Sequence, residues 1–119
     1  MVIIIYQINS YKFGEIEIND NIYHDDVIIY PDKLNDKWWR NEGHRLHVSD
    51  IKDLKDYNLD TIVIGTGASE KMKVDPKLKE YFDLHDIDYY ISNTKQAVQK
   101  HNELSGQDKI IITALHLTC

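Results

Sequence analysis

The sequence predicts a protein of the α/β class, in which helices pack on a mixed sheet. Three observations predict this class. Residues 13–18 alternate between polar and apolar, and β-branched or apolar runs at 60–64 and 110–117 are typical of strands covered on both faces. Helix patterns at 76–85 and 94–104 lie between such runs. Strands that alternate with helices predict parallel crossovers, and the opening hairpin adds antiparallel strands.

The first thirty residues predict strands at 2–8, 12–18 and 27–30. The second of these alternates polar and apolar side chains, as a strand with one buried face does. Residues 19–21, Asn-Asp-Asn, predict a turn, because these side chains hydrogen-bond to nearby backbone and tolerate positive φ. Pro31 cannot donate to a ladder, so we expect the strand of 27–30 to end there.

The middle of the chain predicts a long irregular segment followed by a short helix. Residues 31–48 have no clear period, and such loops in compact domains are usually functional or disordered. Ser49 is a suitable N-cap for the short helix, with Asp50 in its first turn. Ile51 and Leu54 are expected on its buried side.

Capping residues predict the two helices of the second half. Asp75 precedes Pro76, which suits the first position of a helix. A short strand at 88–91 separates this helix from the next, which begins after Asn93 with the signature of a capping box. The buried face of the second helix is predicted to comprise Thr94, Ala97, Val98, His101 and Leu104. His101, on this face, is predicted to be a hydrogen-bonded core histidine.

The length of the chain indicates the number of domains, and its net charge argues against two classes of partner. The 119 residues suffice for one domain, and we expect a single domain over 1–119. The chain has 14 Lys and Arg against 20 Asp and Glu, a net charge of -6. A nucleic-acid partner needs a basic surface, and an anionic membrane attracts one, so neither is expected as a partner.

The single cysteine and the lack of long apolar runs predict the location. Cys119 alone cannot form an intrachain disulfide, and one thiol fits a reducing compartment. No apolar run approaches the roughly 18 residues of a membrane helix. The apolar start at 1–8 lacks a basic leader and a cleavage site. We therefore expect a cytoplasmic protein.

The most unusual segment is 35–48, which holds both tryptophans, Trp38 and Trp39, and both arginines, Arg40 and Arg45. A guanidinium group binds carboxylate or phosphate bidentately and stacks on aromatic rings, which the ammonium group of lysine does less well. Adjacent tryptophans in a loop do not easily share one face, so we predict that at least one is exposed or lines a cleft. The alternative is that both rings pin the loop to the sheet and Arg40 pairs with a nearby aspartate.

A second candidate lies where the strand of 60–64 ends, at Gly65, Thr66 and Gly67. Glycines there permit a close backbone approach, and exposed N–H groups can form an anion nest. The segment is not a dinucleotide fingerprint, because Glu70 occupies the third glycine position. The alternative is a tight turn beside a helix.

The sequence gives little support for a metal site or for covalent catalysis. His44 and His47 are three residues apart, as are His116 and Cys119, but in a strand the latter two point to opposite faces. We predict no metal site, no cofactor and no catalytic residue, since nucleophile, base and orienting group cannot be assembled. Residues 24–26, His-Asp-Asp, are predicted to form a solvated turn.

Several motifs together resemble one family. They are Tyr11-x-Phe13-Gly14-x-Ile16, Tyr23-x-x-Asp26-Val27-x-Ile29-x-Pro31, Trp38-Trp39-Arg40-x-x-Gly43-His44, Gly65-Thr66-Gly67, Thr94-x-x-Ala97, Asn102-x-Leu104 and His116-Leu117-Thr118-Cys119. In this order they resemble the small single-domain family first seen in methanogenic archaea. Its relatives include a mitochondrial respiratory complex I assembly factor and an adipogenesis-associated mammalian protein. The match covers nearly the whole chain.

The resemblance implies a three-layer α/β fold around a mixed five-stranded sheet with one antiparallel strand. It implies no settled enzymatic activity. Animal relatives act as assembly or regulatory factors, so binding to a protein partner is the leading functional expectation.

Two hypotheses about function follow. The leading one is a non-catalytic binding or assembly module, with the candidate surface Trp38, Trp39, Arg40, His44, Gly65, Thr66 and Gly67. The alternative is an enzyme or binder of a small anionic ligand at the same cleft. Arg40 would be its clamp, His44 its acid or base, and the N–H groups of 65–67 its oxyanion donors. The alternative requires these groups to converge on one pocket.

Overall fold

The computed structural model describes residues 2–119, which fold around a central five-stranded sheet with the order β5-β4-β10-β7-β9. Its strands are β4 (Val27–Ile29), β5 (Leu34–Asn35), β7 (Thr61–Gly65), β9 (Asp88–Ser92) and β10 (Ile111–Leu115). Strand β10 pairs in parallel with β7, which pairs in parallel with β9, while β4 is antiparallel to both of its neighbours. The predicted mixed sheet with one antiparallel strand is confirmed.

Alternation along the central strands divides the apolar side chains between two cores. In β7, Ile62 and Ile64 belong to one cluster of buried residues and Val63 to the other. In β10, Ile112 lies in the first cluster and Leu115 in the second. Both faces of the sheet are therefore covered, which explains why these strands are continuously apolar in sequence.

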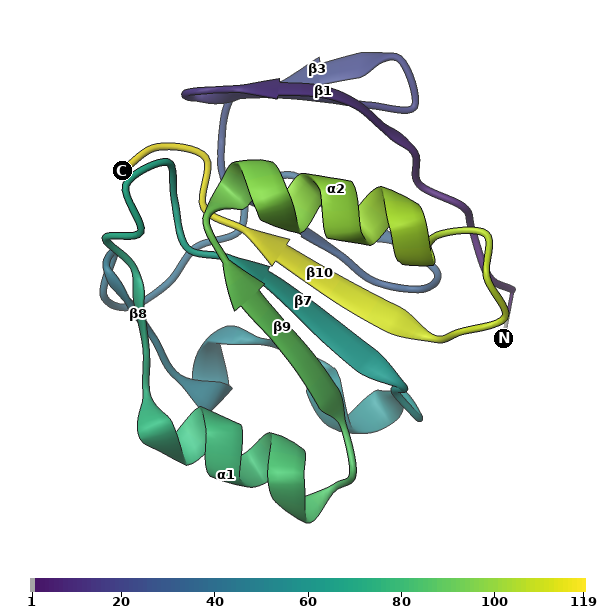
Figure 1. Ribbon diagram of the computed structural model, residues 1–119, viewed down its shortest axis with the longest axis vertical. Coiled ribbons are helices and arrows are strands. Elements are labelled where there is room, and N and C mark those ends of the chain that lie inside the picture. Colours follow the sequence, from purple (N-terminus) through teal and green to yellow (C-terminus); the bar gives the residue numbers. More distant parts are fainter. Residues whose placement is uncertain (1) are drawn as a thin grey trace.

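Each face of the sheet is covered by different elements (Figure 1). One face packs against helix α1 (Pro76–Leu84) and two single-turn helices, η1 (Val48–Asp50) and η2 (Leu54–Asp56). The other packs against helix α2 (Thr94–Leu104) and a small antiparallel sheet. That sheet comprises β1 (Ile8–Lys12), β2 (Glu15–Ile18) and β3 (Asn21–Tyr23), in this order. The three-layer arrangement matches the prediction.

The prediction of a strand at 2–8 is wrong, because pairing begins only at Ile8. The preceding residues are extended, but Ile4 donates its N–H to the carbonyl of Pro31 rather than to a neighbouring strand. The predicted strand of 12–18 is interrupted by a turn at 13–14, where Gly14 has φ of +76°. The Asn-Asp turn after β2 is confirmed, with positive φ at Asn19 and Asp20.

The long segment before β7 is more ordered than its sequence predicts. Besides β5 it contains β6 (Arg45–Leu46), which pairs in parallel with β8 (Lys73–Val74). The expected N-cap at Ser49 is wrong, since η1 starts after His47. The carboxylate of Asp50 accepts the N–H of His47, at 2.8 Å, and so closes the turn two residues earlier.

The predicted caps and the inner face of α2 are confirmed. Asp75 accepts the N–H of Lys77, and Asn93 accepts the N–H of Gln96. The buried residues of α2 are Thr94, Ala97, Val98, His101 and Leu104. Neither helix of residues 2–119 has the length and apolarity needed to cross a bilayer.

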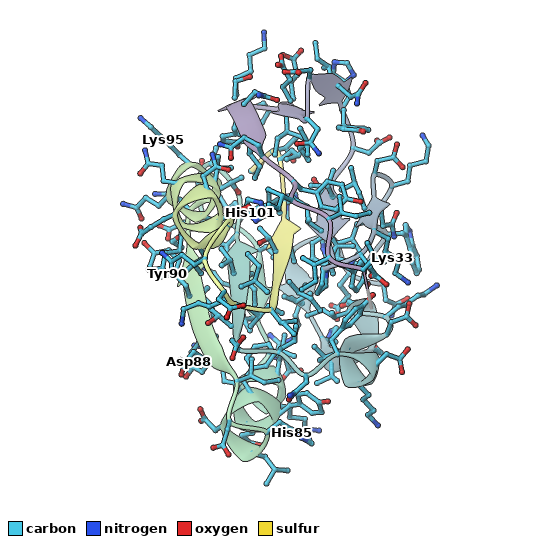
Figure 2. The ribbon with its side chains drawn as sticks, turned by 90° about the vertical axis from the view of Figure 1, so that its right-hand side faces the viewer. Lys33, His85, Asp88, Tyr90, Lys95 and His101 are labelled. Carbon is cyan, nitrogen blue, oxygen red and sulfur yellow. The ribbon has the colours of Figure 1, made fainter. Side chains whose placement is uncertain are left out.

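His101 is the hydrogen-bonded core histidine that the sequence predicts. It lies on the side of α2 that faces β10, whereas Lys95 projects outward from the same helix (Figure 2). Its Nδ1 is 2.6 Å from Thr113 Oγ1 and its Nε2 is 2.6 Å from the carbonyl oxygen of Tyr6. Burial lowers the pKa of His101, despite the opposing hydrogen bond to that carbonyl, so the neutral ring is favoured at pH 7.

Candidate functional site

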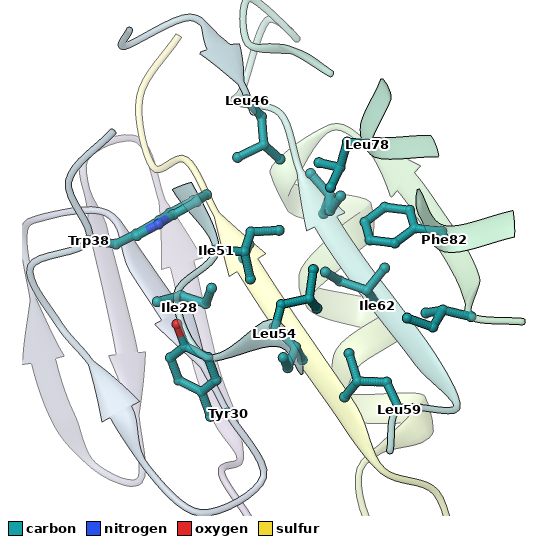
Figure 3. Packing of buried hydrophobic residues seen from close by; sticks show 14 of the residues in the cluster. Ile28, Tyr30, Trp38, Leu46, Ile51, Leu54, Leu59, Ile62, Leu78 and Phe82 are labelled. Carbon is teal, nitrogen blue, oxygen red and sulfur yellow. The ribbon is translucent and has the colours of Figure 1, made fainter. Parts of the chain in front are cut away.

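The two adjacent tryptophans have opposite environments. Trp38 is only 6% exposed and packs in the core beside Ile28 and Ile51 (Figure 3). Its Nε1 donates to the carbonyl oxygen of Asp50 at 2.9 Å, which pins the loop to the body of the protein. Trp39 is 76% exposed. The prediction that at least one of the two rings is exposed is confirmed.

Arg40 is buried, with its side chain only 4% exposed. Its guanidinium group lies over the ring of Trp38, 4.6 Å from the ring centre. One terminal nitrogen, Nη2, donates to Asp26 Oδ2 at 2.9 Å and to the carbonyl oxygen of Gly43 at 2.8 Å. The structure therefore contains the Arg40–aspartate pair of the alternative in which this loop is structural.

His116 joins this pair from the far end of the chain. Its Nδ1 lies 2.8 Å from Asp26 Oδ2 and 3.2 Å from Arg40 Nη2. The ionised carboxylate of Asp26 can only accept, so the hydrogen bond from His116 places a proton on Nδ1. Both N–H groups of Arg40 Nη2 already donate to Asp26 and Gly43, so its approach to Nδ1 is a contact between two donors. The other oxygen of Asp26 accepts the N–H of Leu117 at 2.7 Å. We call Asp26, Arg40 and His116 the buried triad.

The prediction of a solvated turn at 24–26 is wrong for Asp26, whose side chain is only 16% exposed. Burial alone would raise the pKa of Asp26. The hydrogen bonds from His116 and Leu117, together with the attraction of His116 and Arg40, outweigh it and hold the pKa of Asp26 below its ordinary value of 3.8.

This lowered pKa predicts a loss of stability in acid. A carboxylate with a lowered folded-state pKa stabilises the fold above its unfolded-state pKa, and that contribution is lost as the pH falls through the folded-state pKa. The difference in unfolding free energy between the wild type and Asp26→Asn should be constant at neutral pH and shrink below pH 3.8. Urea unfolding from pH 7 to pH 2.5 measures it. A difference that stays the same throughout would contradict the assignment.

The Gly-Thr-Gly turn lies on the other side of His116. The N–H of His116 donates to the carbonyl oxygen of Gly65 at 3.0 Å, and the His116 carbonyl accepts from the hydroxyl of Thr94 at 2.6 Å. The N–H of Gly67 donates to the same hydroxyl oxygen at 2.9 Å, and the N–H of Thr66 donates to Ser92. These donors are used within the protein, so the geometry supports a structural turn rather than the hypothetical anion nest.

Gly67 shows why the turn needs glycine. Its φ is +108°, and a Cβ atom there would lie 2.2 Å from the backbone carbon of Cys119 and 2.9 Å from the ring of His116. Because Gly67 has no side chain, the backbone of Cys119 can pack directly against the Gly-Thr-Gly turn. His44 completes the group, with its ring centre 5.5 Å from that of His116 in an edge-on arrangement. Arg40, His44 and the turn are thus brought together, with His116 between them.

Three polar atoms of the buried triad have no partner among residues 2–119. They are Nε and Nη1 of Arg40 and Nε2 of His116. Each is shielded from solvent, and an unpartnered buried donor or acceptor is costly.

Trp39 helps to line an open depression with a volume of about 430 Å³. Its lining residues are His24, Asp25, Asp26, Lys37, Trp38, Trp39 and Thr118, which we call the Trp39 surface. Asp26 links the depression to the buried triad behind it. The cation Lys37 lies 3.5 Å from Asp25, and both side chains are exposed.

The histidines of the loop do not share a ligand. His44 faces His116, whereas His47 lies 2.6 Å from Glu42 and 3.0 Å from Asp75. The hydrogen bond with Glu42 raises the pKa of His47. Within residues 2–119, no three histidine, cysteine or acidic residues are grouped so as to hold a metal ion.

The family model described as "Protein of unknown function (DUF498/DUF598)" matches residues 8–116. The chain therefore belongs to this family of small α/β domains, whose description assigns no catalytic activity. The match includes the loop with both tryptophans and the buried triad.

Solved structures share the fold. A conserved hypothetical protein from Pyrococcus horikoshii is 23% identical with a TM-score of 0.79, and the match covers 95% of this chain and 99% of that chain. A Bartonella henselae structure described as an outer membrane protein is 19% identical with a TM-score of 0.80, covering 96% of each chain. A Bordetella pertussis protein described as a Mth938-like domain is 14% identical with a TM-score of 0.61, covering 94% of this chain and 85% of that chain. At these identities the likeness shows the fold alone.

Proposed function

We propose that this protein is a non-catalytic binding module that contacts a protein partner through the Trp39 surface. The observation that carries the proposal is the exposure of Trp39, 76%, beside a tryptophan that is locked into the core. Tryptophan is enriched among the residues that dominate binding energy at protein interfaces. A large ring held open to solvent in a depression is available for such a contact.

The loop beneath Trp39 is held in place before any partner arrives. Trp38 is anchored by its hydrogen bond to Asp50, and Arg40 is anchored by Asp26. Trp39 lies between these two anchors in sequence, so its backbone has little freedom. A rigid contact residue loses less entropy on binding, which supports a role for the buried triad in positioning Trp39 rather than in chemistry.

The motif resemblance supports the same proposal. The Trp-Trp-Arg and Gly-Thr-Gly motifs resemble those of a family that includes a respiratory complex I assembly factor, so we propose an accessory or assembly role. The single cysteine, which fits a reducing compartment, supports the proposal of action in the cytoplasm.

Trp39→Ala is expected to weaken partner binding at least tenfold while changing the unfolding free energy by less than about 0.5 kcal/mol. The partner in this test is a set of peptides selected from a random display library on the wild-type protein, with affinities measured by calorimetry. Phe13→Ala is the matched control, because Phe13 is an exposed aromatic outside the Trp39 surface. Equal affinities for wild type and Trp39→Ala would contradict the proposal.

A small anionic ligand is the second candidate, favoured by the unpartnered Nε and Nη1 of Arg40. Both atoms are shielded from solvent, so a ligand can reach them only if the groups packed around the guanidinium of Arg40 move apart. Inorganic phosphate, titrated against ¹⁵N-labelled protein, should shift the side-chain N–H signals of Arg40, and Arg40→Lys should abolish the binding because the planar fork is lost. No shift in the wild type would remove this candidate.

A further inference from the structure

A separate cavity lies at the other end of the molecule from the C-terminus. Its volume is about 250 Å³. It is bounded by residues 3–6 and by residues 105–110, the connection between α2 and β10. Figure 1 shows the N-terminal segment passing beside this connection. The cavity shares no lining residue with the Trp39 surface.

Isoleucine and leucine form much of the cavity wall, which also includes the polar residues Ser105 and Gln107. Among its lining residues Ile29 and Leu104 are buried, Ile111 is half-buried, and Ile3 and Ile5 remain more than half exposed. Four consecutive aliphatic residues, 2–5, are exposed. Contiguous exposed apolar surface of this kind marks a binding site more often than scattered single residues do.

The outer wall is tethered rather than loose. The N–H of Ile4 donates to the carbonyl of Pro31 at 2.8 Å, and the carbonyl of Tyr6 is 2.6 Å from Nε2 of His101. The polar atoms of the His101 ring are thereby used within the protein, so the ring presents no free donor or acceptor to the cavity.

The charges at the rim do not select an ionic ligand. Asp108 and Lys109 are the only charged lining residues among those described, apart from the neutral-favoured His101, and their charges cancel. The carboxyl end of α2 lies beside them, and the partial negative charge of a helix C-terminus opposes an anion. The whole chain, with a net charge of -6, opposes one too.

We propose that this cavity binds an uncharged aliphatic chain, such as that of a fatty alcohol or an esterified acyl group. A dry cavity of about 150 Å³ lined by Leu, Ile and Phe accepts benzene, so this larger one accommodates a chain of about eight carbons. The chain covers the exposed Ile3 and Ile5 and packs against Leu104 and Ile111. This inference does not depend on the function proposed for the Trp39 surface.

The test is a titration of protein with ¹³C-labelled isoleucine methyl groups by hexanol, octanol and decanol, followed by NMR. We expect shifts in the methyl signals of Ile3, Ile5, Ile29 and Ile111. Affinity should rise about fourfold with each added methylene until the cavity is filled and then level off. Octanoate, with its carboxylate, should bind more weakly than octanol. Equal or tighter binding of octanoate would overturn the choice of an uncharged ligand.

Two exposed isoleucines give a matched pair of variants that should both fold. Ile5→Ser should weaken octanol binding about fivefold, because the wall loses aliphatic area, while Ile22→Ser, on the exposed side of β3, should not change it. The proposal is overturned if the wild-type methyl signals do not move, or if both variants behave alike. It is also overturned if sedimentation shows a dimer whose intermolecular NOEs join the Ile3 and Ile5 methyl groups, since a second copy then covers this face.

Discussion

Asp26→Ala is expected to reduce the free energy of unfolding by about 3 kcal/mol or more, although residues 24–26 have the sequence of a solvated turn. Asp26 accepts hydrogen bonds from Arg40, His116 and the backbone of Leu117. Its removal leaves the guanidinium group of Arg40, almost wholly buried, without a counter-charge. Urea unfolding at pH 7 measures the loss.

The neighbouring aspartate provides a stringent control. Asp25 is adjacent in sequence and carries the same charge, but its side chain is 64% exposed and its only ion pair, among the described residues, is with exposed Lys37. Asp25→Ala should change the unfolding free energy by less than about 0.5 kcal/mol. Similar losses for the two variants would mean that the buried triad does not stabilise the fold.

Ile62→Ala is expected to reduce the free energy of unfolding by about 2–5 kcal/mol, as measured by chemical denaturation. Ile62 is fully buried in the middle of β7, between β10 and β9, and packs among the residues of the core beneath α1 (Figure 3). Truncation removes apolar contacts and leaves a cavity that the flanking strands cannot close.

The control for the central strand is Ile22→Ala, because Ile22 is exposed on β3. Its loss in chemical denaturation should not exceed about 0.5 kcal/mol. A loss below half a kcal/mol for Ile62→Ala as well would show that β7 is not the centre of the core.

The elements that the sequence predicts well are those in which local pattern and tertiary environment agree. Strands β7 and β10 are buried on both faces, so their β-branched and apolar runs are unbroken. Helix α2 has a cap at Asn93 and an inner face whose members all follow the helical period. The structure of such segments can therefore be predicted from their own sequence, without knowing which elements pack against them.

The N-terminal segment could not be predicted in the same way. Its isoleucines have the composition of a buried strand, but they line a cavity and remain exposed because no strand pairs with them. A segment rich in isoleucine favours an extended backbone. Whether another strand pairs with that segment depends on the tertiary structure.

The candidate site was predicted in part. The concentration of tryptophan and arginine identifies the loop, and the adjacency of Trp38 and Trp39 predicts one exposed ring. The sequence gives no sign that Asp26 and His116, 90 residues apart, share a hydrogen bond. A buried ion pair needs only one oppositely charged partner nearby, and with twenty acids in the chain no local signal selects the right one.

The most direct test of the binding proposal is to map a selected peptide onto the protein by NMR. We expect the largest shift at the indole N–H of Trp39, with further shifts at the backbone amides of Lys37, Asp25 and His24, and none at the isoleucines of the apolar cavity. Peptide shifts confined to other surfaces, with the Trp39 indole signal unmoved at saturation, would contradict the account.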